Sequence, residues 1–179
     1  MPVAERRTQL AVGVLAAAMA GLAFAAYPLG AIAAMAAFVA VVLVVIAAVD
    51  IRSFTIPNRI VLPATAIVLV ADMVFIPGRA IEFVLAALLA GVALLIPNLI
   101  NSSWMGMGDV KLGLLLGAAL GWGVLGALEI AFVAVLPFAF AALVCRGSEA
   151  RSAVLPFGPF MAFGALVVII VPRLLGLGG

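Results

Sequence analysis

The sequence predicts an all-α fold, a polytopic bundle of transmembrane helices with about seven spans. Of its 179 residues, 69% are apolar and only 9% are charged, whereas an ordinary soluble domain carries about 25% charged residues. Long apolar runs such as 31–49 and 84–97 lack the short alternating pattern of barrel strands. The length leaves room for at most about eight spans and for no soluble domain of normal size. We therefore expect a single integral-membrane domain over residues 1–179.

Breaks in the apolar pattern divide the chain into seven predicted helices. They cover residues 9–26, 31–49, 60–76, 81–97, 110–125, 127–145 and 154–172. A turn near Gly123–Gly126 separates the fifth helix from the sixth. The first helix, preceded by Arg6 and Arg7, also resembles a signal peptide, and its removal would leave six spans. Its apolar run exceeds the roughly 7–15 residues of a signal peptide, so we expect it to be kept.

The basic residues predict how the helices are oriented. With a cytoplasmic N-terminus, only Arg79 and Arg173 of the nine Lys and Arg residues fall outside, as the positive-inside rule favours. This topology places the two longest polar connections, 50–59 and 98–109, together on the cytoplasmic face. The basic residues form no cluster, so we expect membrane lipid around the chain and no nucleic-acid partner.

Several kinds of catalytic chemistry are excluded by composition. The chain has no histidine, and Cys145 is its only cysteine, so intramolecular disulfides, Cys-rich zinc sites and Ser-His-Asp triads are ruled out. The groups that could still carry catalytic chemistry are carboxylates, lysine, hydroxyls and backbone groups. A divalent cation between two carboxylates is chemically feasible, but too few carboxylates share one face. We expect no metal and no cofactor.

The seven carboxylates divide into two groups. Five are interpreted as solvated or interfacial charges, some of them pairing with Arg79: Glu5, Asp72, Glu82, Glu129 and Glu149. Asp50 ends the apolar run 31–49 and Asp109 begins the helix 110–125. Taken singly, Asp50 could pair with Arg52, and Asp109 could be a helix N-cap.

Taken together, Asp50 and Asp109 lie at the same predicted depth on the same face. If their helices pack together, two carboxylates in one partly dehydrated site cannot easily both ionise. One keeps its proton, and the pair can act as general acid and general base around one water, as in an aspartic protease. Gly106 and Gly108 would let backbone, or an extended substrate, approach Asp109 closely.

Three motifs follow one another between residues 50 and 159. They are Asp50 with Ile56-Pro57-Asn58, then Gly106-Met107-Gly108-Asp109-Val110-Lys111-Leu112, then Pro156-Phe157-Gly158-Pro159. In this order they resemble the prepilin peptidase family, membrane aspartic proteases of the GxGD type that serve type IV pili and protein secretion. The chain is similar to the short form that serves Flp/Tad-type pili.

The resemblance implies both a function and a site. Asp50 and Asp109 would be the catalytic pair that removes the short basic leader of pilin-like precursors at the cytoplasmic face of the inner membrane. Lys111 would orient a substrate carbonyl or hold the charge of Asp109, and a plain positive-inside anchor is the alternative. The remaining residues that would shape the site are Gly106, Gly108, Pro57, Pro156 and Gly158.

One activity of the longer family members is not expected here. Those members carry a cytoplasmic insertion with paired cysteines and also methylate the new N-terminus. This chain has one cysteine and no long cytoplasmic loop, so we predict no N-methyltransferase activity.

Two other functions remain open on the residues alone. An ion-coupled transporter would also use intramembrane carboxylates, but the aspartates lie at one membrane face and no inverted repeat is present. A scaffold subunit would use the aspartates only as caps and interfacial charges.

Overall fold

The computed structural model describes residues 3–28, 30–101, 105–146 and 156–174. Within these ranges the fold is all-helical, which confirms the predicted class. The elements are α1 (Val3–Ala25), α2 (Ala31–Ser53), α3 (Asn58–Phe75), the 3₁₀ turn η1 (Pro77–Arg79), α4 (Ala80–Ile100), α5 (Met107–Leu120), α6 (Gly123–Arg146) and α7 (Gly158–Leu174).

All seven predicted helices are present, but two boundaries differ for reasons that bear on the site. α2 continues past residue 49 to Ser53, and it stops where Phe54 adopts a left-handed conformation and donates its N–H to the Asp50 carbonyl. The turn expected near Gly123–Gly126 lies earlier, between Leu120 and Gly123. There Gly121 has a φ of +55°, which glycine adopts at little cost. The first part of the segment 154–172 lies outside the described residues.

Five segments are long and apolar enough to cross a membrane, in the part of the chain that the structure describes. They are Glu5–Ala25, Ala31–Ser53, Asn58–Phe75, Pro77–Ile100 and Gly123–Ala141. A shorter apolar helix covers Gly158–Pro172. The 14 residues of α5 rise only about 21 Å, less than the roughly 30 Å of a bilayer core. The chain is therefore a multi-pass membrane protein in which α5 is too short to cross the core alone.

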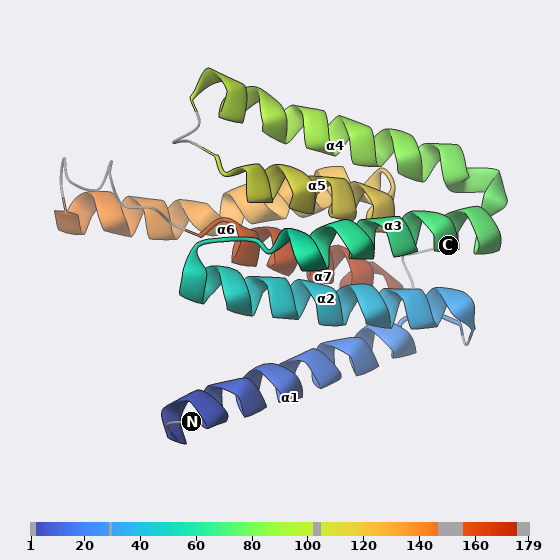
Figure 1. The fold of residues 1–179 in the computed structure, drawn as a ribbon, viewed down its shortest axis with the longest axis horizontal. Coiled ribbons are helices and arrows are strands. Elements are labelled where there is room, and N and C mark those ends of the chain that lie inside the picture. Colours follow the sequence, from blue (N-terminus) through green and yellow to red (C-terminus); the bar gives the residue numbers. More distant parts are fainter. Residues whose placement is uncertain (1–2, 29, 102–104, 147–155, 175–179) are drawn as a thin grey trace.

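The helices lie side by side along one direction (Figure 1). The end of α2, the start of α3, the end of α4 and the start of α5 all lie at the same end of the bundle as the start of α1, while the end of α7 lies at the other (Figure 1). The two polar connections therefore share one end, as the sequence predicted.

Small residues bring α5 very close to α4. A Cβ atom added to Gly117 would lie 2.5 Å from the Ala86 carbonyl oxygen, and one added to Gly113 would lie 2.6 Å from a methyl of Leu94. Such glycines let helix backbones approach closely in membrane proteins. Besides α4, α5 contacts α3 and α7, and Leu112, Leu115 and Leu116 are fully buried there. This packing holds the first turn of α5 beside α3 and α7.

Candidate active site

A polar cavity of about 330 Å³ opens where the end of α2, the start of α3 and the start of α5 meet. Its lining includes five residues singled out in the sequence: Asp50, Gly106, Gly108, Asp109 and Lys111. The others are Phe54, Thr55, Ile56, Asn58 and Met107. Two aspartates from different helices thus face one small space.

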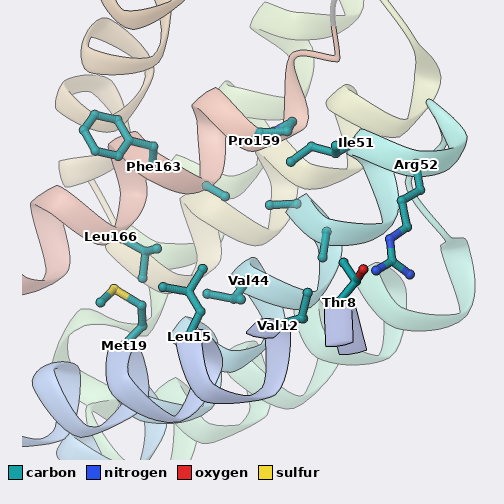
Figure 2. A pocket seen from close by; sticks show the side chains of 13 residues that line it. Thr8, Val12, Leu15, Met19, Val44, Ile51, Arg52, Pro159, Phe163 and Leu166 are labelled. Atoms are coloured by element: carbon teal, nitrogen blue, oxygen red, sulfur yellow. The ribbon is translucent and has the colours of Figure 1, made fainter. Parts of the chain in front are cut away.

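Asp50 lies in the last turn of α2 and is only 5% exposed. Its Oδ2 accepts a hydrogen bond from the Gly158 backbone N–H at 3.2 Å. The alternative that Asp50 pairs with Arg52 is wrong, because the one ion pair among the described residues joins Arg79 and Glu82. Arg52 is exposed and, with Ile51, lines a separate groove between α1, α2 and α7 (Figure 2).

Asp109 is the third residue of α5, and its Oδ2 accepts the Gly106 N–H at 3.3 Å. Gly106 is the N-cap of α5, so the interpretation of Asp109 itself as the N-cap is wrong. Asp109 lies outside the segments long enough to span the membrane. Burial and, to a smaller extent, the charge of Asp50 raise the pKa of Asp109 to about 6, although the hydrogen bond from the Gly106 N–H acts in the opposite direction. The influence of Asp50 requires the two carboxyl groups to be near each other.

The segment between α2 and α3 packs directly on the start of α5. Ile56 is buried, and a Cβ atom added to Gly108 would lie 2.9 Å from the Ile56 Cβ. Gly108 therefore allows this segment to close over the first turn of α5. Pro57 is the N-cap of α3 and is not among the cavity-lining residues.

Lys111 is hydrogen-bonded across the cavity rim. Its Nζ donates to Asn58 Oδ1 at 2.8 Å, which joins the first turns of α5 and α3. Asn58 belongs to the Ile56-Pro57-Asn58 motif, yet it was not predicted as a site residue. The motif itself was the available signal, because an amide side chain beside a helix start can partner a cation.

The third motif contributes through one residue. Gly158 is buried in the first turn of α7 and contacts Asp50. Pro156 precedes α7 and does not line the cavity. The motif therefore reaches the candidate site through its glycine.

Among the described residues, the other carboxylates follow the predictions with one exception. Glu82 pairs with Arg79 at 2.8 Å, and Glu5 and Glu129 are exposed; Glu149 lies outside the described residues. Asp72, expected at the interface, is only 1% exposed, and neither of its carboxyl oxygens has a hydrogen-bond partner among the described residues. The interfacial interpretation of Asp72 is wrong because this position faces the protein interior.

We expect the variant Asp72→Val to be more stable than the wild type. Each buried polar group without a partner costs about 1–3 kcal/mol, and an apolar side chain of similar size removes that cost. The midpoint of thermal unfolding in detergent should rise by roughly 2–4 °C per kcal/mol. Asp72→Asn, which keeps the polar atoms, should gain less. If Asp72→Val unfolds at a lower temperature than Asp72→Asn, then the Asp72 carboxyl group has a partner or a role.

Among the described residues, no three His, Cys, Asp or Glu side chains gather as a metal site. The absence of a metal or cofactor stays a prediction.

The fold and the cavity together define a class, helical membrane proteins with two aspartates in one site at the end of the bundle. A family model described as the type IV leader peptidase family matches residues 37–147. This covers more than half of the chain, and the chain belongs to that family. The match includes Asp50 and Asp109 and ends before Pro156. No curated protein and no solved structure matches the chain.

Proposed function

We propose that this chain is a membrane aspartic endopeptidase that removes the short basic leader from type IV pilin-like precursors. The observation that carries the proposal is that Asp50 and Asp109 line one cavity. Membership of the leader peptidase family supports a peptidase, and these two residues are the paired acidic groups that line its cavity.

The pair can hydrolyse a peptide bond with a single water. The ionised aspartate takes a proton from the water, whose oxygen attacks the scissile carbonyl carbon, while the protonated aspartate donates to the carbonyl oxygen. The C–N bond then breaks as the aspartate that took the proton from water gives it to the leaving nitrogen. The other aspartate takes back a proton from a hydroxyl of the tetrahedral intermediate, so the pair returns to its starting state. A pKa of about 6 for Asp109 means that the pair keeps a shared proton at a higher pH than a solvated carboxylate would.

The position of the cavity suits a substrate with a polar leader and an apolar helix. Asp50 lies one turn inside α2, and the helix ends that line the cavity lie at the same end of the bundle as the start of α1 (Figure 1). In the topology that the basic residues favour, this end faces the cytoplasm, with the chain in the inner membrane. The leader would enter from the cytoplasm while the apolar helix of the precursor stays in lipid.

The proposal is tested by co-expressing the chain with a pilin-like precursor and measuring the precursor mass. We expect loss of the leader without an added methyl group. Cleavage by the purified protein should continue when a chelator of divalent cations is added, because two carboxylates and a water need no metal. A precursor that stays intact with folded protein present would contradict the function. Cleavage abolished by the chelator and restored by a divalent cation would contradict the mechanism.

A further inference from the structure

We propose that Gly158 is a positioning residue for Asp50. Its backbone N–H holds the carboxyl group, and its lack of a side chain gives that group the space it occupies. The inference rests on the proposed function for its meaning in catalysis, but the contact itself can be tested without activity.

The hydrogen bond comes from the start of a helix. The N–H groups of Phe160 and Met161 both donate to the Phe157 carbonyl, so Gly158 is in the first turn of α7, where N–H groups have no partner within the helix. The Gly158 N–H finds its partner in Asp50 Oδ2, at 3.2 Å. The start of a helix also carries partial positive charge, which favours a carboxylate placed there.

The space around Gly158 is filled by Asp50. A Cβ atom added to Gly158 would lie 2.6 Å from Asp50 Oδ2, 3.1 Å from its Cγ and 3.4 Å from its Cβ. These are the three nearest heavy atoms, and all belong to Asp50. Any side chain at position 158 must therefore displace the carboxyl group.

The other aspartate is held in a similar but looser way. Asp109 Oδ2 accepts the N–H of Gly106 at the start of α5, so each aspartate accepts a glycine N–H at a helix start. A Cβ atom added to Gly106 would lie 3.4 Å from Asp109 Oδ2, which is an ordinary contact. The requirement for glycine is therefore strict at 158 and mild at 106.

α7 packs directly against α2 beside the Asp50–Gly158 contact. Ile51 and Pro159, which follow Asp50 and Gly158 in sequence, both line the apolar groove of about 400 Å³ between α1, α2 and α7 (Figure 2). Moving α7 away from α2 to admit a Cβ atom would therefore also disturb the packing of α7 against α2 and α1.

The first experiment measures cleavage of a purified precursor by Gly158→Ala. We expect kcat to fall about 100-fold, the loss that a misplacement of about 1 Å can cause. The kcat of Gly106→Ala should fall much less. Gly126→Ala is the matched control, because its added Cβ atom would meet only Val168, at 3.9 Å, and it should cleave as the wild type does. Because Gly158 does not line the cavity, KM should stay close to the wild-type value while kcat falls. A wild-type kcat for Gly158→Ala would overturn the proposal.

The second experiment is a stability cycle that does not depend on activity. Gly158→Ala should lower the midpoint of thermal unfolding in the wild type but much less in an Asp50→Ala background, since the atoms that collide are then gone. This interaction is read as the difference between the two shifts, and it stays measurable if Gly158→Ala alone is poorly folded. Equal shifts in both backgrounds would overturn the proposed contact. If the cycle shows coupling while Asp50→Asn still cleaves the precursor, the proposed function fails and the contact stands.

Discussion

Asp50→Asn and Asp109→Asn should each reduce leader cleavage by about 10⁴-fold or more, the scale seen when one member of a catalytic unit is removed. An amide can neither accept the proton of the attacking water nor share a proton with its neighbour. The side-chain oxygen of asparagine can still accept the N–H of Gly158 or Gly106, so the fold should be retained. The measurement is the fraction of precursor processed by equal amounts of inserted protein, with elution from a sizing column in detergent as the check on folding.

The matched control for both variants is Glu129→Gln. It makes the same change from carboxylate to amide at an exposed position of α6 outside the cavity lining, and it should process the precursor as the wild type does. Normal processing by either aspartate variant would contradict the dyad. Loss of processing in all three would point to a general effect of charge on insertion. A solute flux in proteoliposomes that disappears only in the two aspartate variants would instead favour a transporter.

The fold was predictable because the bilayer simplifies the problem. Runs such as 31–49 are too long and too apolar for any other environment, and their breaks lie at prolines, glycines and charges. The errors came from local backbone geometry. The turn was expected near Gly123–Gly126, whereas the structure places it at Gly121, which has a positive φ, and sequence alone does not distinguish among neighbouring glycines.

The candidate site was predictable to the extent that its members are rare. Asp50 and Asp109 stood out because so few carboxylates exist, and the shared end of their helices followed from topology. The hydrogen-bond partners of Asp50 and Lys111 could not be predicted in this way. Asp50 was open to a local pairing with Arg52, but its partner is Gly158, 108 positions away in sequence, and Lys111 bonds Asn58 across two helices. Such contacts depend on which helices pack together.

The burial of Asp72 was missed for the same reason. Counting charges along the chain placed it near a membrane boundary, and snorkelling is the usual behaviour there. Which side of α3 faces the neighbouring helices decides its exposure, and a helix apolar on most sides does not reveal this in its sequence.

The position of Asp109 depends on how closely α5 packs against α4. α5 has only 14 residues and carries Asp109 in its first turn. Gly117, two turns further along, is the point of closest approach, because the atoms nearest to an added Cβ are backbone atoms of Ala86 and Ala87. Backbone atoms cannot rotate away as a side chain can, so any side chain at 117 must separate the two helices.

We therefore expect Gly117→Ala to be the most damaging glycine substitution in this helix pair. We expect this overpacking to cost about 3 kcal/mol, the upper end of the usual range, which corresponds to a fall of roughly 6–12 °C in the midpoint of thermal unfolding. Cleavage should fall as well, even below the unfolding temperature, because α5 carries Asp109 away from Asp50. Gly13→Ala in α1 is the control, since nothing lies within 4 Å of its added Cβ atom and alanine favours the helix by about 1 kcal/mol. An unchanged midpoint for Gly117→Ala would mean that α4 and α5 lie far enough apart to admit a side chain at 117. Close packing against α4 would then not be what fixes the position of Asp109.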